Sequence, residues 1–338
     1  MTNATVAIVG GIPNPIGGVT TFIRRVIRRE QCVTHLFDIY PSDFKSIPNE
    51  YGGKYICKKN KLFTMSQLWL FLLAGRVDMV HFNFSTPRAL FFLLLLPKRK
   101  VKWLLTLHHG DLGKGTTVWG RWVLSRKVDY VLSLNDRQSQ WYAFSVPPGK
   151  ILPSTSYVPP SPPCPSPEFV ASFSTLKCGY QRVFVCSGYP KALYNHLLIM
   201  EVMRFFPDSV LFCCLYGEGD LKEEIISGAS QMNNVVLFDE LDEEDFNYLL
   251  SGADLYFRIT SEDSFGIAVA DSLVFGGGCI SSDVCPRYPG ATLVSPFCSL
   301  MQLKEAVESV FSVSCDLPKS SGDFSGFSYE FINQLSHD

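Results

Sequence analysis

The sequence predicts an α/β protein built from two parallel-sheet domains. Its 338 residues leave room for two domains of ordinary size. Short apolar stretches alternate with segments of helical periodicity in both halves, which is typical of strands joined by crossover helices. A proline-rich stretch, VPPSPPCPSP at residues 158–167, separates the halves as an extended linker. We therefore expect one domain at residues 1–160 and a second at residues 161–338.

The formal charge is divided unequally between the two halves. Residues 1–150 contain 21 Lys and Arg and 8 Asp and Glu, whereas residues 151–338 contain 9 and 24. Such a basic half is expected to face an anionic surface. Because the basic residues lack a recognisable nucleic-acid fold or an aromatic platform, we expect lipid head groups rather than nucleic acid. A basic domain that only balances its acidic partner is the alternative.

The 11 cysteines show no metal-ligand spacing, which favours free thiols in a reducing cytosol. The polar opening TNAT runs directly into a strand, so no signal peptide is expected. The longest apolar run, at residues 89–96, is too short to span a bilayer. These features together predict a cytoplasmic protein.

The chain opens with a strand at residues 6–9, a glycine-containing turn and a helix at residues 19–29. Gly17 and Gly18 precede this helix, and a helix N-terminus is a natural anion site because its N–H groups are unpaired. A dinucleotide-binding fingerprint is excluded by spacing, since it would need glycine in place of Ile12.

The helix at residues 19–29 is expected to have two faces. Its apolar face contains Phe22, Ile23, Val26 and Ile27, and its basic face contains Arg24, Arg25, Arg28 and Arg29. The basic face is either solvated over a core stripe or in contact with anionic lipid.

The first half continues with strands at residues 34–39, 78–82, 103–107 and 128–134, and with helices at 66–74, 89–96 and 135–144. Residues 41–65 are expected to be irregular and basic. The strand at 103–107 ends in His108 and His109. Side chains at the carboxyl end of a parallel strand lie on the ligand face of the sheet, so these histidines are candidate site residues.

The second half is expected to contain strands at residues 182–186, 211–216, 235–238, 255–257 and 279–280. Helices are expected at 267–275 and 300–311, with a last helical turn near 329–335. The acidic run at 240–245 fits an exposed helix start, where the helix dipole favours carboxylates.

The turn after residues 255–257 carries the most informative polar groups. Asp263 lies in this turn, and Asp271 lies within the apolar helix that follows. Gly266 at the helix start leaves room for a ligand against backbone N–H groups. Because a buried carboxylate costs free energy unless it has a partner, Asp271 is expected to meet one or to bind a ligand.

This stretch resembles the nucleotide-sugar site of retaining GT-B glycosyltransferases of family 4. The family pattern is Glu, Gly, Phe, Gly, four residues and Glu, and the same frame here holds Asp263, Ser264, Phe265, Gly266 and Asp271. The flanking segments FRITSEDS and SSDVCPRYPG resemble a bacterial subgroup that builds cell-surface polysaccharide such as O-antigen or capsule. An ordinary turn with a capping aspartate is the alternative.

The resemblance implies a GT-B fold, with two Rossmann-like domains facing a cleft. Residues 1–160 would form the acceptor side and residues 161–338 the donor side, and a final helix would cross back to the first domain. The catalytic residues it implies are His108, Asp263, Lys191 and Arg258. The donor-binding residues it implies are Gly17, Gly18, Lys191, Arg258, Ser264, Phe265, Gly266, Ile267 and Asp271.

The implied reaction is transfer of a sugar from a UDP- or GDP-linked donor to a hydroxyl of a glycan acceptor, with retention and without a metal or other cofactor. Asp271 would bind the ribose, Asp263 would bind the transferred sugar, and His108 would lie near the anomeric carbon. Cations and helix N-termini would stabilise the leaving diphosphate. The expected acceptor is lipid-linked, with the protein attached peripherally to the inner face of the cell membrane.

Three departures from the family pattern keep other functions open. Both glutamates are shortened to aspartate, Ser264 replaces a glycine, and no arginine precedes Lys191. A catalytically weak GT-B-like subunit that only binds nucleotide-sugar is one alternative. A nucleotide-sugar epimerase on a similar scaffold is the other.

Overall fold

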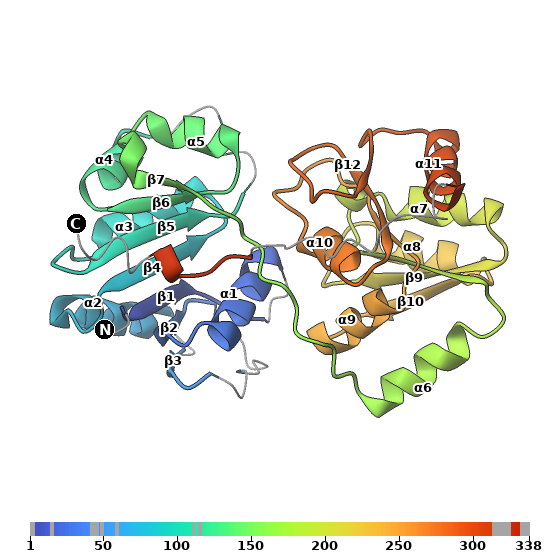
Figure 1. The fold of residues 1–338 in the computed structure, drawn as a ribbon, viewed down its shortest axis with the longest axis horizontal. Helices are drawn as coiled ribbons and strands as arrows, with labels where there is room; N and C mark the ends of the chain where they lie inside the picture. Colours follow the sequence, from blue (N-terminus) through green and yellow to red (C-terminus); the bar gives the residue numbers. More distant parts are fainter. Residues whose placement is uncertain are drawn as a thin grey trace. The chain divides into compact units, whose positions relative to one another are not determined.

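The computed structural model describes residues 4–13, 17–40, 47, 51–57, 61–109, 112–113, 117–312 and 326–331. The chain divides into two compact units (Figure 1). The first unit comprises residues 1–158 together with 325–338, and the second comprises residues 159–324.

The first unit contains a seven-stranded sheet in the order β3-β2-β1-β4-β5-β6-β7, in which every pairing is parallel. Its strands are β1 Val6–Gly10, β2 Val33–Asp38, β3 Lys54–Ile56, β4 Met79–Phe84, β5 Lys102–Leu107, β6 Tyr130–Ser133 and β7 Ile151–Pro153. Its α-helices are α1 Gly18–Arg29, α2 Lys61–Ala74, α3 Leu90–Leu95, α4 Val118–Arg126 and α5 Asp136–Ala143, with short 3-10 helices η1 Pro87–Ala89 and η2 Pro148–Lys150.

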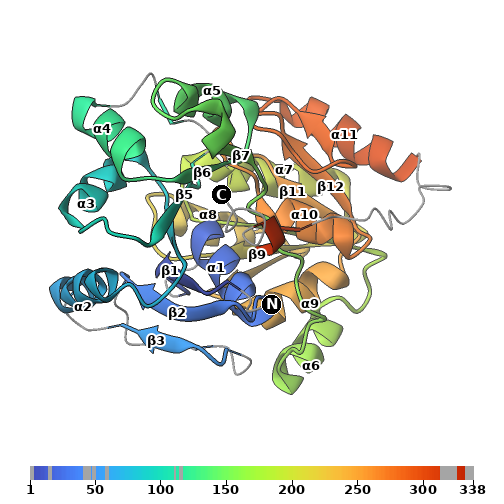
Figure 2. The ribbon, with the colours of Figure 1, turned by 60° about the vertical axis from the view of Figure 1, so that its left-hand side comes forward.

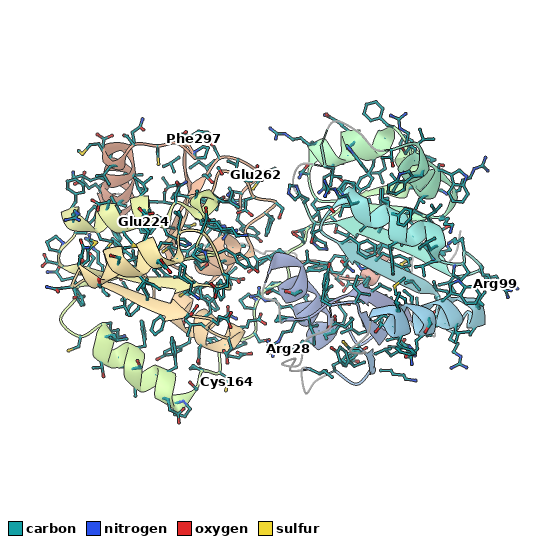
Figure 3. The ribbon with its side chains drawn as sticks, turned by 180° about the vertical axis from the view of Figure 1, so that it is seen from behind. Arg28, Arg99, Cys164, Glu224, Glu262 and Phe297 are labelled. Atoms are coloured by element: carbon teal, nitrogen blue, oxygen red, sulfur yellow. The ribbon has the colours of Figure 1, made fainter. Side chains whose placement is uncertain are left out.

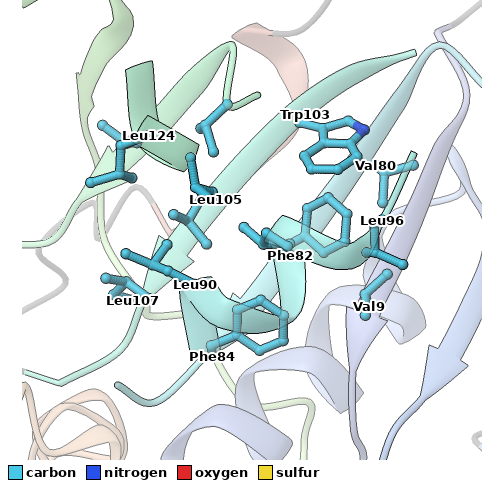
Figure 4. Packing of buried hydrophobic residues seen from close by; sticks show 14 of the residues in the cluster. Val9, Val80, Phe82, Phe84, Leu90, Leu96, Trp103, Leu105, Leu107 and Leu124 are labelled. Atoms are coloured by element: carbon cyan, nitrogen blue, oxygen red, sulfur yellow. The ribbon is translucent and has the colours of Figure 1, made fainter. Parts of the chain in front are cut away.

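The two faces of this sheet bury different helices because side chains alternate along each strand. On one face, strand residues such as Phe82, Trp103 and Leu105 pack with Leu90 of α3 and Leu124 of α4 (Figure 4). The helices α2 and α5 contribute to the same apolar cluster. The order α2, α3, α4 along this face is visible in two views (Figures 1 and 2).

The opposite face is covered by α1 and by residues 326–331 near the end of the chain. Phe22 of α1 lies 5.1 Å from Phe327, measured between ring centroids. The backbone N–H of Phe327 donates to the carbonyl of Tyr157, and the Tyr329 hydroxyl lies 2.6 Å from Nδ1 of His81 in β4. Phe327 and Tyr329 therefore form part of the first unit's core.

The expectation of a separate basic face on α1 is wrong in one respect. Arg25 is only 4% exposed, and its Nη1 donates to the carbonyl oxygen of Val158 at 3.0 Å. Arg24 and Arg28 are half-buried, so Arg29 is the one fully exposed arginine of this described helix. The segment that leaves the first unit at Val158 covers part of the helix, and an isolated helix pattern cannot reveal such a cover.

The second unit contains a six-stranded parallel sheet in the order β10-β9-β8-β11-β12-β13. Its strands are β8 Arg182–Gly188, β9 Ser209–Leu215, β10 Val235–Asp239, β11 Leu255–Arg258, β12 Gly278–Ser282 and β13 Thr292–Val294. Its helices are α6 Pro167–Leu176, α7 His196–Val202, α8 Lys222–Ser230, α9 Glu243–Ser251, α10 Ile267–Val274 and α11 Leu300–Ser312, with 3-10 helices η3 Ala192–Tyr194 and η4 Met203–Phe205.

The predicted fold class is confirmed, since both sheets are parallel and helices connect their strands. The acidic run at 240–245 does start a helix, with Asp242 as the N-cap of α9. The predicted irregular segment contains β3, and α2 begins at Lys61 rather than at residue 66. Residues 41–46, 48–50 and 58–60 of that segment, and 332–335 of the predicted last turn, lie outside the described residues. Among the described helices, none combines the length and apolar character needed to cross a membrane.

Candidate functional site

The second unit has its topological switch point between β8 and β11, which are neighbours in the sheet although two strands separate them in sequence. Crossover connections leave this point in opposite directions, which opens a crevice at the carboxyl ends of the two strands. The turn that follows β11 and the loop that follows β8 both lie at this edge. They contain Lys191, Ser264, Phe265 and Gly266 of the predicted donor-site residues, and Arg258 ends β11 at the same edge.

A buried ion cluster organises the turn after β11. The Oδ2 atom of Asp263 accepts hydrogen bonds from Nε of Arg258 at 2.9 Å and from Nη1 of Arg287 at 2.7 Å. Its Oδ1 atom accepts from the backbone N–H of Ser264. The exposed fractions of the side chains are 8% for Asp263, 16% for Arg258 and 1% for Arg287. Two guanidinium groups and one carboxylate give the cluster a net charge of +1.

The electrostatics of the cluster favour its charged forms. Burial opposes ionisation of Asp263, but Arg258 and Arg287 outweigh it and hold the carboxyl pKa well below its usual 3.8. Burial likewise disfavours the Arg258 guanidinium, yet Asp263 raises the pKa of Arg258 overall. Asp263 and Arg258 therefore stay ionised throughout the neutral pH range.

Arg287 was not predicted as a site residue. Besides Asp263, it donates to the carbonyl oxygens of Ser282 and Phe265 and to the hydroxyl of Thr260. It therefore joins the turn after β11 to the end of β12. Its segment PRYPG lies within the stretch that resembles the family, but a lone arginine near two prolines gives no local signal of a buried partner.

Gly266 is required by this geometry. Its φ of +78° lies in the left-handed region, and a Cβ atom there would lie 2.6 Å from Nη1 of Arg287 and 3.2 Å from Oδ2 of Asp263. Ser264 and Phe265 precede it in the turn, and α10 begins directly afterwards at Ile267. The predicted helix start at residue 267 is confirmed.

Asp271 lies in α10 and is 1% exposed. It makes interactions of its own within the protein. The expectation that this buried carboxylate meets a partner therefore agrees with its environment, whereas its predicted contact with a ribose stays a prediction.

The loop after β8 exposes Lys191 to solvent, and contacts with the turn after β11 hold this loop in place. Tyr194 lies under the Arg258 guanidinium, 4.9 Å from the ring centroid, and the backbone N–H of Ser261 donates to Leu193. The Asn195 side chain donates to the carbonyl of Ile259. These contacts join the loop to the turn after β11. Lys191 itself is exposed, so its ammonium group is available to an anion at this edge.

The first unit has its own polar edge, at the switch point between β1 and β4. His108, directly after β5, is 6% exposed, and its Nε2 lies 2.9 Å from Oδ1 of Asn83 at the end of β4. The Asn83 amide nitrogen donates to the His81 carbonyl, which directs Oδ1 at His108. Nε2 of His108 therefore carries the proton, and Nδ1 is an acceptor.

Burial lowers the pKa of His108 to about 3, so the imidazole is neutral at physiological pH. Phe22 of α1 packs against the His108 ring at 5.1 Å. Gly17 is the N-cap of α1 and Gly18 its first residue, and neither is buried. Asn83 was not predicted as a site residue, because a single asparagine in an apolar strand is an ambiguous signal. His109 is exposed, unlike His108.

Comparison with known proteins rests on structure alone, since no family model and no curated protein matches the sequence. Anabaena HepE, crystallised in complex with UDP and glucose, superposes with a TM-score of 0.69 at 11% identity, over 92% of this chain and 90% of that one. The chain has the GT-B fold.

Two further structures with this fold are similar. WaaG, a glycosyltransferase involved in lipopolysaccharide biosynthesis, has a TM-score of 0.60 at 14% identity, over 91% of this chain and 90% of that one. Sucrose-phosphate synthase from Thermosynechococcus elongatus has a TM-score of 0.62 at 14% identity, over 92% and 90%. HepE has also been crystallised with UDP-glucose.

Within this GT-B chain, the predicted site residues fall into two groups. Arg258, Asp263 and Gly266 meet in one cluster, and Lys191 lies on the adjoining loop. The other group, His108 with Gly17 and Gly18, belongs to the first unit.

Proposed function

We propose that this GT-B protein is a retaining glycosyltransferase that uses a nucleotide-diphosphate sugar as its donor. The observation that carries the proposal is the cationic cluster of Arg258, Asp263 and Arg287 at the switch point of the second sheet, beside the exposed Lys191. A preorganised positive charge at this edge suits a diphosphate leaving group. The fold shared with HepE, which binds UDP-glucose, supports a UDP-linked sugar as the first donor to test.

The site residues would contact different parts of the donor. Lys191 and the two arginines would stabilise the negative charge that develops on the diphosphate. Asp271 would accept hydrogen bonds from the ribose. Because both Asp263 oxygens already have protein donors, a sugar hydroxyl would share them, and Asp263 would also fix the two arginines in place. The neutral His108 would offer Nδ1 as an acceptor to a sugar hydroxyl.

The donor site is tested by nucleotide binding. Asp271→Ala should weaken binding of UDP or GDP by about 1–3 kcal/mol, the usual cost of losing a buried hydrogen-bond partner. Asp263→Ala should reduce turnover more than nucleotide affinity. Glu262→Ala removes an exposed carboxylate from the same turn and is the matched control (Figure 3). Unchanged affinity and turnover in both aspartate variants would disprove the site.

The reaction class is tested by the product. NMR of the anomeric coupling should show retention, and turnover should persist in EDTA. Inversion, or loss of activity in EDTA that metal restores, would contradict the proposal. Interconversion of the free donor without an acceptor would identify an epimerase, and nucleotide-sugar binding without transfer or hydrolysis would identify a binding subunit.

We further propose a lipid-linked glycan acceptor in the assembly of bacterial surface polysaccharide, with peripheral attachment to the inner face of the cell membrane. The supporting surface is an apolar face formed by α2, α3 and α4. Large apolar side chains on these helices are 43–87% exposed: Leu62, Phe63, Trp69, Leu70, Phe91, Leu95, Val118 and Trp122. Soluble surfaces rarely gather so many, so a partner is expected to cover them.

The charge around the apolar face indicates what that partner is. Residues 61–127 contain 11 Lys and Arg and 2 Asp and Glu. Arg99 and Lys100, after α3, are exposed, and Arg99 points away from the ribbon (Figure 3). Each basic residue near an anionic leaflet contributes about 1 kcal/mol. Apolar insertion flanked by basic residues is typical of peripheral membrane binding.

Co-sedimentation with lipid vesicles tests this attachment. Binding should require anionic lipid, weaken with added salt, and fall at least about tenfold in the double variant Phe63→Ser, Leu70→Ser, because burial of each side chain contributes about 1.5–3 kcal/mol. Phe297→Ser changes a phenylalanine of the second unit that is 85% exposed, against 64% for Phe63, and is the control (Figure 3). Equal binding to neutral and anionic vesicles, or none at low salt, would leave a soluble acceptor as the better proposal.

A further inference from the structure

We propose that Cys186, His196 and Cys213 form a binding site for one thiophilic metal ion, of the Cu⁺ or Zn²⁺ class, inside the second unit. Their ligand atoms all lie within 4.8 Å of one another. In the part of the chain that the structure describes, no other group of three or more such side chains converges in this way. This proposal is independent of the transfer reaction proposed above.

The fold brings the three residues together from separate elements. Cys186 in β8 and Cys213 in β9 are register partners in the parallel sheet, so their side chains emerge on the same face. His196 is the first residue of α7, which packs on that face within the same apolar cluster. The spacing in sequence, ten residues and then 17, matches no local metal motif.

The imidazole is oriented as a ligand. Nε2 of His196 donates to the carbonyl oxygen of Tyr189 at 3.2 Å. The proton therefore lies on Nε2, and the lone pair of Nδ1 points at the two sulfur atoms, 3.8 Å from Sγ of Cys186 and 3.6 Å from Sγ of Cys213. A backbone carbonyl that fixes the tautomer in this way is typical of metal-binding histidines.

The distances suit an ion at the centre. Metal–sulfur and metal–nitrogen bonds of about 2.3 and 2.0–2.1 Å place neighbouring ligand atoms of a tetrahedral or trigonal ion about 3.5–3.8 Å apart. The observed separations of 3.6 and 3.8 Å lie at these values. The two sulfur atoms lie within 4.8 Å of each other and would close to about 3.8–4.0 Å around an ion.

The chemistry of the pocket selects a soft ion. All three side chains are at least 97% buried among apolar residues, which disfavours hydrated ions such as Mg²⁺ or Ca²⁺. Two sulfur ligands and one imidazole suit Cu⁺ and Zn²⁺.

A bound ion would stiffen the loop after β8. The Tyr194 ring stacks on the His196 ring, with the two ring centroids 5.9 Å apart. The Arg258 guanidinium lies 4.9 Å from the centroid of the same Tyr194 ring. Tyr189, whose carbonyl orients His196, begins the same loop. Metal binding at His196 would therefore anchor the segment that presents Lys191.

The experiment is metal titration of the full-length, reduced, chelator-treated protein. Zn²⁺ and, without oxygen, Cu⁺ should each bind at one equivalent per chain and raise the melting temperature, and Co²⁺ should give a sulfur-to-cobalt charge-transfer band. Cys213→Ser and His196→Asn should lose the band and the stabilisation. Cys214→Ser is the matched control, because Cys214 is equally buried in β9 but belongs to the cluster on the opposite face of the sheet.

Thiol alkylation in the wild-type protein keeps the test decisive if the variants do not fold. Because both ligand thiols are buried, alkylation is followed at a denaturant concentration just below the unfolding transition, where the second unit opens transiently. One equivalent of metal should then protect the peptides that contain Cys186 and Cys213, but not those with the exposed Cys164 and Cys178. Equal alkylation with and without metal, or a cobalt band that Cys213→Ser retains, would overturn the proposal and leave thiol hydrogen bonding to His196 as the explanation.

Discussion

Replacing Arg287 by methionine should destabilise the second unit strongly and leave the first unit unchanged. The side chain is 1% exposed, its Nη1 lies 2.7 Å from the Asp263 carboxylate, and methionine fills much of its volume without its charge. Removing one partner of a buried ion pair costs about 3–5 kcal/mol. Arg258 still pairs with Asp263, so the cost comes mainly from the Asp263 oxygen and the carbonyl oxygens of Ser282 and Phe265, which each lose a buried donor. A loss of this size lowers the melting temperature of a unit of this length by roughly 6–20 °C.

The two units can be followed separately in one experiment. All five tryptophans lie between residues 69 and 141, so tryptophan fluorescence reports only the first unit, whereas circular dichroism reports both. Arg287→Met should shift the dichroism transition alone. Arg204→Met removes a half-exposed pair with Glu201 and should cost less than about 1 kcal/mol.

Acid should reduce the difference between wild type and Arg287→Met. Asp263 has a folded-state pKa below its unfolded value of 3.8, so its contribution is complete above that pH and is lost as the pH falls further. Arg287→Met has less of this contribution to lose. A cost below about 1 kcal/mol at pH 7, or a difference that grows on acidification, would refute the reasoning from the ion cluster.

Three further outcomes are expected. Burial lowers the pKa of His108 to about 3 and that of His81 well below 6.5. The first unit's free energy of unfolding, followed by tryptophan fluorescence, should therefore fall by about 2 kcal/mol per histidine between pH 7.5 and 5. His81→Asn should remove about half of that fall. Lys127→Met should cost about 1–3 kcal/mol by the same readout, because the Lys127 ammonium donates to three carbonyls around the end of α3. Gly266→Ala should cost about 1–3 kcal/mol in the dichroism transition and weaken nucleotide binding, since φ is +78° and the new Cβ would meet Arg287.

Local patterns predicted the elements with a strong apolar signal. The strands expected at 103–107 and 182–186 and the helix at 267–275 correspond to β5, β8 and α10 within two residues at either end. The three-residue strands β3, β7 and β13 were missed, because so short a stretch carries too little periodicity to stand out. The helix α4 was missed as well, since Gly120 and basic residues interrupt its apolar pattern.

The site shows the same division between local and distant information. Asp263, Gly266 and Asp271 could be recognised together because one strand, one turn and one helix hold them within nine residues. Asn83 could not be linked to His108, because neighbouring strands bring them together across 25 residues. A sequence pattern records only contacts that recur at short spacing.

The sequence by itself determined the two parallel sheets, the asymmetry of charge and the polar turn after β11, because each depends on apolar periodicity or on composition along a continuous stretch. Only the tertiary structure decided which charges are paired and which thiols meet. Arg287 reaches Asp263 across 24 residues, Arg25 is covered by the segment at Val158, and Cys186 faces Cys213 through strand register. The physical reason is that burial and pairing depend on what the rest of the chain places against a residue, which its own neighbours in sequence do not specify.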